Sequence, residues 1–538
     1  MKKFVLPPRS FWLIPAAVVL LRGIPFLFTL LAVTPGGAFF PPVGYNPVDS
    51  FAYVAFIRQT AETGDWLLSN PYTNLPQSGR FILPLFALLG HLSRWTGADA
   101  FWLLELARIP LVFVFFAVLW YFLGPLLTNV RQRFIAAWLV AFSGGIEFLF
   151  LSNLDRWPPR VRTTLAEALS DDQGWNTFAS MNNPLWIAGL ILTLIALRPL
   201  LMRAGEQRPR DWIQFALAFL VTYFMHPYSG LVVMSVAVLL PVIRWYLDDQ
   251  EGSRKYLIGL CAGLGVSLPI IAAISFWQNR DTVFRLAAEN VLGNYSLSIF
   301  WYPVTLGALG LLAARGWRRW IQNRVPGRME IGAWTLVVIF MHSSPLLNGF
   351  HFVFHLHIPV CMVAATALDE FLLCFRNGTA RKRVATLFLL VCLFQSPLTV
   401  TWRSGKRALS YQVPGPIMSA ISRLAQEPAG LVYTSPHLGT MIPAFTNHRA
   451  YVGHWFLTPD FATKQDYFLA LADGRISPEW LRDLIINEKI DYVLLPPGMP
   501  MPVLNALRTL ASEVIETGGA VLLIIHGEAL EGLEGVGG

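Results

Sequence analysis

The stretch FWLIPAAVVLLRGIPFLFTLLAV at residues 11–33 decides the fold of this chain. It reaches the roughly 20 apolar residues that a helix needs to cross a bilayer, and Arg22 is its one charged residue. A short basic leader with Lys2, Lys3 and Arg9 precedes it. The run is too long for the core of a signal peptide and lacks a clear small-x-small cleavage site, so we expect a retained membrane anchor.

Similar apolar runs recur through the first 400 residues. Hydrophobic residues make up 54% of the 538-residue chain, charged residues only 14%, and the mean hydropathy is +0.50. A soluble protein of this length could not bury so much apolar surface in ordinary domain cores. We therefore predict an all-α polytopic membrane domain over residues 1–400, with eleven transmembrane helices near 11–33, 101–123, 131–152, 182–201, 211–226, 228–246, 255–277, 299–315, 330–344, 355–373 and 383–400.

Residues 81–92 are apolar as well, but this run is short and is interrupted by Pro84 and His91. We predict a helix that lies at the membrane interface and does not cross. With this choice, most arginines and lysines before residue 400 fall in the connections assigned to the cytoplasm, as the positive-inside rule prefers. The N-terminus is then cytoplasmic, and the exterior loops are 34–100 and 153–181.

The net charge of +8 raises the question of nucleic-acid binding. The basic residues lie in short clusters between apolar runs and are not gathered on one domain with interleaved aromatic residues. This is the pattern of membrane topology, so we expect a lipid bilayer as partner, in the plasma membrane, and no nucleic acid.

The tail, residues 401–538, has a different composition and is expected outside the cytoplasm. Its short β-branched and aromatic runs predict strands near 430–434, 449–453 and 490–495. Residues 462–472 and 478–489 have the pattern of helices. We predict a small extracytoplasmic α/β domain.

Charged residues inside membrane spans are costly and are usually retained for pairing or for function. Apart from Arg22, the unusual polar residues fall near the outer ends of their predicted spans: Glu105, Arg108, Glu147 and His226. Glu105 and Arg108 stand three residues apart on one helix, so mutual neutralisation explains that pair equally well. The gathering on one side favours a polar pocket that opens outward.

The first exterior loop contains one clear helix signal. Asn46 suits the N-cap, Pro47 the first helical position and Gly64 the C-terminal stop of an amphipathic helix. Asp49 falls in its first turn and shares one stripe with Tyr53. A carboxylate there can simply cap the helix start and complement the dipole, and local sequence alone favours that reading over catalysis.

Helical spacing also continues the stripe of Asp49 to Phe56 and Thr60, and it places Arg58 on the opposite face. Glu62 lies one turn beyond Arg58, so we expect these two side chains to form an ion pair. Arg58 is therefore not expected to contact Asp49.

Four stretches together resemble one known superfamily. They are residues 49–59 running into 64–73, Leu106-Ala107-Arg108, His226-Pro227-Tyr228, and the tail stretch 451–455, read Tyr-Val-Gly-His-Trp. With the order of anchor, acidic exterior loop, many spans and exterior tail, the chain resembles the GT-C glycosyltransferases. The nearest branch is bacterial, is related to protein mannosyltransferases and uses polyprenyl-phosphate sugars.

This resemblance implies an enzyme that moves a sugar from a polyprenyl-phosphate donor to a glycan, lipid or protein acceptor outside the cytoplasm. It implies that Asp49 is the catalytic acid of the first loop, acting at the acceptor or at a metal. Many relatives carry two adjacent acids there, whereas Val48 and Ser50 flank Asp49. A divalent metal stays open as a cofactor, and no metal ligand is assigned.

The resemblance also suggests a set of substrate-binding residues: Arg22, Tyr53, Glu105, Arg108, Glu147, His226 and His454. Two rival functions stay open. One is a transporter or flippase of a lipid-linked saccharide, although no internal repeat of fixed period is visible. The other is a catalytically inactive membrane scaffold, in which the tail is a packed cap without a ligand.

Overall fold

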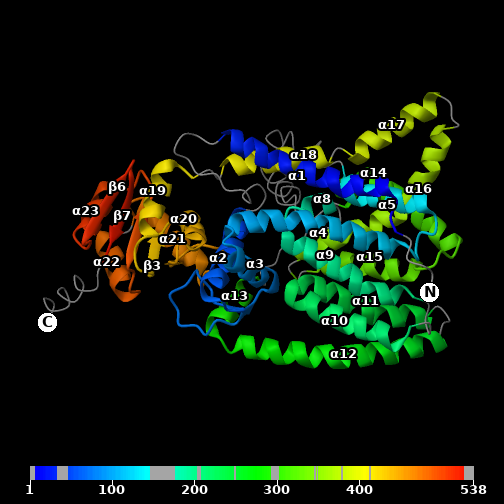
Figure 1. Ribbon diagram of the computed structural model, residues 1–538, viewed down its shortest axis with the longest axis horizontal. Helices are drawn as coiled ribbons and strands as arrows, with labels where there is room; N and C mark the ends of the chain where they lie inside the picture. Colours follow the sequence, from blue (N-terminus) through cyan, green and yellow to red (C-terminus); the bar gives the residue numbers. More distant parts are fainter. Residues whose placement is uncertain are drawn as a thin grey trace. The chain divides into compact units, whose positions relative to one another are not determined.

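The computed structural model describes most of the chain in two compact units (Figure 1). The described residues are 6–32, 47–145, 176–202, 207–246, 250–291, 302–344, 347, 349–376, 380–394, 396–410, 413–475 and 477–525. Unit 1 comprises Met1–Pro25, Leu106–Ile274 and Gly293–Ser404, and unit 2 comprises Phe26–Glu105, Ser275–Leu292 and Gly405–Gly538. The first exterior loop thus belongs to the same unit as the tail, whereas the predicted division fell at residue 400.

Unit 1 consists of helices, and four of them, α1, α4, α12 and α18, continue into unit 2. In chain order they are η1 (Arg9–Trp12), α1 (Leu13–Ala32), α4 (Ala100–Leu123), α5 (Val130–Phe142), α8 (Thr177–Ser180), α9 (Pro184–Leu197), η4 (Arg198–Leu201), α10 (Pro209–Met225), α11 (Pro227–Tyr246), α12 (Gln250–Asn279), α14 (Tyr302–Gln322), α15 (Arg328–Ser343), η6 (Gly349–His355), α16 (His357–Arg376), α17 (Ala380–Phe394) and α18 (Ser396–Ser410).

Each of the eleven predicted spans overlaps at least one of these helices, and the span predicted at 383–400 runs from α17 into α18. Among the residues that the structure describes, five segments are both long enough and apolar enough to cross a membrane: Arg9–Phe28, Ala100–Leu123, Pro184–Leu201, Pro227–Tyr246 and Ser253–Asn279. The protein is therefore a membrane protein with several spanning helices. The other predicted spans coincide with shorter or less apolar helices, such as the 13-residue α5, and there the crossing stays a prediction.

Proline and side-chain caps begin several helices of unit 1. Pro184, Pro209 and Pro227 each occupy the first position of α9, α10 or α11, where a missing N–H costs nothing and the fixed φ suits a helix. The side chain of Asn183 accepts a hydrogen bond from the N–H of Leu185 and so caps α9. Local sequence thus sets where these apolar helices start.

Unit 2 contains the predicted first-loop helix, α2 (Pro47–Thr63), which begins and ends as the sequence indicates. Gly64 adopts φ 80° directly after it and donates a hydrogen bond to Thr60 O. The helix is buried on more faces than an amphipathic interfacial helix would be, because Phe51, Val54 and Ile57 are all shielded from solvent. It packs against α3 (Pro84–Thr96) and α20 (Pro436–Phe445).

Helix α3 is the predicted short helix, shifted by a few residues toward the C-terminus. Its 13 residues span about 20 Å, too little for a hydrocarbon core of about 30 Å. Gly90 lets it approach α2 closely, because a Cβ there would lie 2.4 Å from Thr60 Cβ. Strands β1 (Leu67–Leu68) and β2 (Phe81–Ile82) pair antiparallel in the same loop.

The tail forms a five-stranded mixed sheet in the order β4-β3-β5-β7-β6 (Figure 1). The strands are β3 (Leu431–Thr434), β4 (Arg449–Ala450), β5 (Tyr492–Leu495), β6 (Glu513–Thr517) and β7 (Ala520–Ile524). The helices are α19 (Gly415–Leu424), α20, α21 (Phe461–Ala472), α22 (Pro478–Asn487) and α23 (Met501–Arg508). Strands β3, β4 and β5 run parallel to one another. Strand β7 runs antiparallel to both of its neighbours, β5 and β6.

The three strands and two helices predicted for the tail are present. Strands β3 and β5 are buried along their whole length, as expected of apolar strands covered on both faces. A further short helix, α13 (Thr282–Val291), joins unit 2 from the middle of the chain. Unit 2 is therefore assembled from three separate parts of the sequence.

Candidate active site

Asp49 lies in the first turn of α2, the third residue of the helix. Its side chain is 22% exposed, so solvent or a substrate can reach it. One turn further on, the hydroxyl of Tyr53 donates to Asp49 Oδ2 at 3.5 Å. The carboxylate lies where the unpaired backbone N–H groups of the helix start concentrate positive charge.

The tail supplies the second side chain of the site. His454 Nε2 lies 3.0 Å from Asp49 Oδ1, although the two residues are 405 positions apart in sequence. In contrast to the carboxylate, the imidazole is only 1% exposed. A buried ring from the tail therefore holds one oxygen of a carboxylate from the first loop.

The hydrogen bonds of His454 indicate which ring nitrogen carries the proton. The backbone N–H of Phe456 points at Nδ1 at 3.4 Å, which makes Nδ1 the acceptor. In the neutral imidazole the other nitrogen then carries the hydrogen. Nε2–H therefore donates to Asp49 Oδ1, so that the ring orients the carboxylate without removing its charge.

Two asparagines hold the loop that follows His454. Asn290 of α13 donates through Nδ2 to the carbonyls of Phe456 and Thr458, at 3.0 and 3.2 Å. Asn70 of the first loop donates through Nδ2 to the carbonyl between them, that of Leu457, at 2.6 Å. All three parts of unit 2 thus converge on this loop and fix the position of the imidazole.

Helix α13 is itself anchored to the first loop through Asp281. This carboxylate caps the helix by accepting from the N–H groups of Val283 and Phe284, and it accepts from the N–H and hydroxyl of Ser78 at 2.8 Å. Burial alone would raise the pKa of Asp281, but the bonds from Ser78 and the helix start outweigh it and the pKa is lowered. Asp281 is therefore an ionised anchor for the helix that carries Asn290.

The backbones of the loop and the tail approach one another closely beside the site. The N–H of Ala450 donates to Pro71 O at 2.9 Å. A Cβ at Gly453 would lie 2.6 Å from Tyr72 Cδ1, so only glycine fits directly before His454. Segments joined by such bonds lie on the same side of a bilayer, so the first loop and the tail share one face of the membrane.

Tyr72 packs beside His454 at the site. Its hydroxyl donates to Thr440 O at 3.1 Å, and its ring lies 6.0 Å from that of His454. Burial raises the pKa of Tyr72, and the negative charge of Asp49 raises it further. The phenol therefore stays neutral and serves as a packed wall.

Three predicted site residues thus lie together: Asp49, Tyr53 and His454. The predicted ion pair of Arg58 with Glu62 is present at 3.2 Å. Sequence reasoning missed Asn70, Tyr72 and Asn290 as parts of the site. The first two fall inside the first-loop stretch that carried the superfamily resemblance, which was the available signal, whereas nothing in the sequence marks Asn290.

Of the other predicted site residues that the structure describes, Arg22, Arg108 and His226 belong to unit 1 and Glu105 belongs to unit 2. Arg22 is 2% exposed within unit 1, and its guanidinium lies 4.9 Å from the centre of the Phe178 ring. Arg108 is also assigned to unit 1 and Glu105 to unit 2, both on α4. Glu147 lies outside the described residues.

His226 belongs to a buried polar cluster of unit 1. Its Nδ1 lies 2.8 Å from Ser229 Oγ, and the same hydroxyl lies 3.0 Å from His355 Nε2. Gly189 of α9 packs directly on this pair, because a Cβ there would lie 2.9 Å from the Ser229 hydroxyl. These contacts give His226 a structural role that needs no ligand.

The donor groups around Asp49 bear on whether the site could bind a metal ion. Within the part of the chain that the structure describes, no three His, Cys, Asp or Glu side chains are grouped so that they could hold a metal ion. The donor set at Asp49 consists of one carboxylate and one imidazole whose Nε2 carries a proton.

Similarity to known proteins is found in the structure of this chain and not in its sequence. No protein-family model and no curated protein sequence matches this chain. The apo oligosaccharyltransferase of Archaeoglobus fulgidus superposes with a TM-score of 0.55 at 12% identity, over 90% of this chain and 69% of its own. The same enzyme, AglB, in complex with an inhibitory peptide and a dolichol-phosphate gives 0.51 at 13% identity, over the same shares.

ArnT from Cupriavidus metallidurans, bound to undecaprenyl phosphate, superposes with a TM-score of 0.53 at 14% identity. That match covers 97% of this chain and 99% of ArnT. At these identities the likeness is one of fold. The chain thus shares the fold of these solved structures, and this is the level at which the resemblance predicted from the sequence is confirmed.

Proposed function

We propose that this chain is a membrane glycosyltransferase that moves a sugar from a polyprenyl-phosphate donor to an acceptor on the extracytoplasmic face. The single observation that carries the proposal is the contact of 3.0 Å between Asp49 and His454. A partly exposed carboxylate, oriented by a buried neutral ring, has the geometry of a general base. Solved structures of the same fold in complex with dolichol-phosphate and undecaprenyl phosphate support the lipid donor.

In the proposed step, an acceptor hydroxyl gives its proton to Asp49 as its oxygen bonds to the anomeric carbon of the sugar. The bond between that carbon and the lipid phosphate breaks, and its electron pair leaves with the phosphate. His454 keeps Oδ1 in place, so Oδ2 faces the acceptor beside Tyr53. This division of roles needs a rigid imidazole, and the two asparagine anchors on its loop supply one.

The departing phosphate needs a cation. Arg22 and Arg108 are the proposed sources of positive charge, because arginines retained inside membrane helices usually serve a substrate or a partner. A guanidinium matches the geometry of phosphate oxygens. The proposed sidedness rests on the basic connections predicted to be cytoplasmic, which leave the first loop and the tail on the opposite face.

The proposal is tested with purified full-length protein and a panel of polyprenyl-phosphate sugars, by measuring release of the lipid phosphate. Replacing Asp49 with Asn should lower the rate about 10²–10⁴-fold, the usual contribution of a general base. Asp65→Asn is the matched control, since Asp65 is an exposed acid of the same loop. It should leave the rate unchanged.

Three other outcomes would contradict this proposal or support another function. Near-normal turnover by Asp49→Asn would end the assignment of the base. Movement of the intact lipid across vesicles without release of phosphate would identify a flippase. Binding of the donor with neither reaction, over the whole panel, would identify a scaffold.

A further inference from the structure

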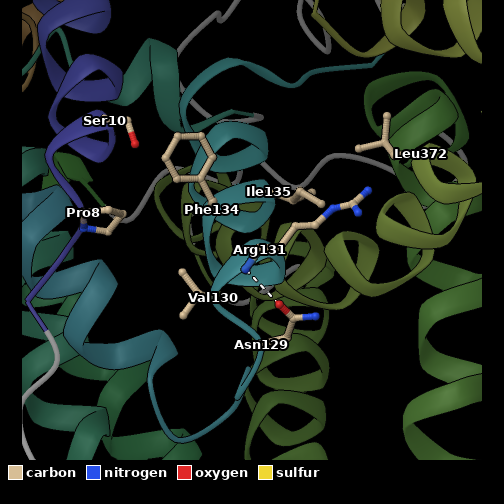
Figure 2. A pocket seen from close by; sticks show the side chains of 8 residues that line it. All are labelled: Pro8, Ser10, Asn129, Val130, Arg131, Phe134, Ile135 and Leu372. Carbon is tan, nitrogen blue, oxygen red and sulfur yellow. Dashed lines mark hydrogen bonds between the residues drawn. The ribbon is translucent and has the colours of Figure 1, made fainter. Parts of the chain in front are cut away.

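A groove within unit 1 lies outside the proposed active site and has a chemistry of its own. It has a volume of about 720 Å³ and is bounded by the start of η1, the N-terminus of α5 and one residue of α16. Figure 2 shows its lining residues: Pro8, Ser10, Asn129, Val130, Arg131, Phe134, Ile135 and Leu372. The volume is in the range of pockets that hold a small ligand or a lipid chain.

Its lining is divided between apolar and polar side chains. Phe134, Ile135 and Leu372 supply an apolar wall, and Arg131 reaches along it with its charged end (Figure 2). Val130 is 49% exposed at the opening. An amphiphile with a long chain and a charged end fits such a surface better than a compact polar metabolite does.

Arg131 is held in a fixed position at the groove. Its Nε lies 2.8 Å from Asp369 Oδ1, and this carboxylate is 7% exposed, whereas the arginine side chain is 44% exposed. Gln132 donates to the other oxygen of Asp369 at 3.2 Å, which keeps the carboxylate in place. The ion pair occupies one of the five N–H donors of the guanidinium, so the group can bind a second anion.

The place of the groove in the membrane argues for a lipid. Pro8 and Ser10 stand at the beginning of the candidate span Arg9–Phe28, so the groove lies where a span meets the headgroup layer. Arg9 is on η1 and Arg131 is on α5, and Asp369 of α16 pairs with Arg131. Their excess positive charge complements an anionic headgroup.

We propose that this groove binds one anionic phospholipid, with its phosphate on Arg131 and an acyl chain along Phe134 and Leu372. The bound lipid stabilises unit 1 by tying its N-terminal segment to α5. This site is separate from glycosyl transfer, and it stands or falls independently of the proposed enzymatic activity.

The test uses full-length protein in detergent and native mass spectrometry with phosphatidylglycerol and phosphatidylcholine of identical chains. Val130→Trp fills the groove and leaves the Arg131–Asp369 pair intact, and Arg131→Gln removes the anion contact. Val238→Trp and Arg315→Gln are the matched controls, an exposed valine of α11 and an ion-paired arginine of α14. We expect both groove variants to weaken phosphatidylglycerol binding about tenfold, the value of one charged hydrogen bond, and the controls to retain it.

Equal retention of phosphatidylglycerol by Val130→Trp and the wild type would overturn the proposal. So would equal binding of phosphatidylcholine and phosphatidylglycerol by the wild type, since the headgroup charge would then be irrelevant. A third arm adds undecaprenyl phosphate. If Val130→Trp weakens binding of this lipid but not of phosphatidylglycerol, the groove is a donor site and the phospholipid assignment is wrong.

Discussion

Two sets of histidines in this molecule look alike in sequence and differ in their surroundings. His226 and His355 of unit 1 share the hydroxyl of Ser229 inside a helical core. In contrast, Nε2 of His454 in unit 2 contacts the carboxylate of Asp49, which is partly open to solvent. The two sets of histidines therefore differ in whether the partner of the ring is open to solvent.

The largest difference between the two sets should appear on replacing each histidine. His454→Ala should lower transferase activity about 10- to 100-fold, because Asp49 loses the donor that orients it. His454→Gln should recover part of the loss, since its amide N–H can occupy the place of Nε2–H. Initial rates of lipid-phosphate release measure both.

His226→Ala is the companion variant. It should lower the melting temperature of the protein in detergent, because Ser229 and His355 lose a buried partner, while the rate per folded molecule stays within about twofold of wild type. A drop in rate matching that of His454→Ala, at unchanged melting temperature, would abolish the distinction between the two sets.

The next effect concerns the close backbone contact beside His454. Gly453→Ala should destabilise the protein by about 1–3 kcal/mol, because a Cβ would collide with Tyr72 and with the backbone of Gly439. Gly265→Ala is the control, since a Cβ there meets no atom within 4 Å. Thermal unfolding of both variants measures the difference, and equal melting temperatures would show that the loop and the tail are not packed as described.

A smaller effect is expected at the asparagine that anchors the loop. Asn290→Ala frees the carbonyls of Phe456 and Thr458 and should lower kcat about threefold to tenfold, with KM for the donor little changed. Asn279→Ala removes an asparagine that bonds only within its own helix end and should have no effect. A change in stability of Asn290→Ala without a change in kcat would reduce Asn290 to a structural residue.

The smallest effect is a pH dependence in the tail. Burial lowers the pKa of Lys464 to about 8, from 10.5 in the unfolded chain. Between these values the unfolded state holds the proton more firmly, so stability rises with pH across this window. Lys464→Met should remove this rise in melting temperatures measured from pH 8 to 10.5. A rise that persists in the variant would assign it to another group.

Local signals predicted much of the fold. The ends of α2 follow from Pro47 and Gly64, and the tail strands β3 and β5 follow from short buried apolar runs. Strand β6 was not predicted, because the exposed, charged pattern of Glu513–Thr517 does not resemble a core strand. Strand β7 was missed although its apolar run is typical of one. Propensity and periodicity describe one helix or strand at a time, and the correct predictions all concern single elements.

The site was predictable in its parts but not in its assembly. Asp49 and His454 were both singled out, yet their contact joins residues 405 positions apart and leaves no local pattern. On sequence alone, Asp49 was better explained as a helix cap. Asn290 could not be found at all, because its role depends on α13 returning to the loop after His454.

The central claim is that Asp49 and His454 act as one unit, and a double-mutant cycle tests it most directly. Rates of lipid-phosphate release are measured for wild type, Asp49→Glu, His454→Ala and the double variant, Asp49→Glu retaining a carboxylate so that a residual rate can be measured. If the two residues act together, the double variant should be about as slow as the slower single variant. Losses that multiply, as for two independent residues, would contradict the account.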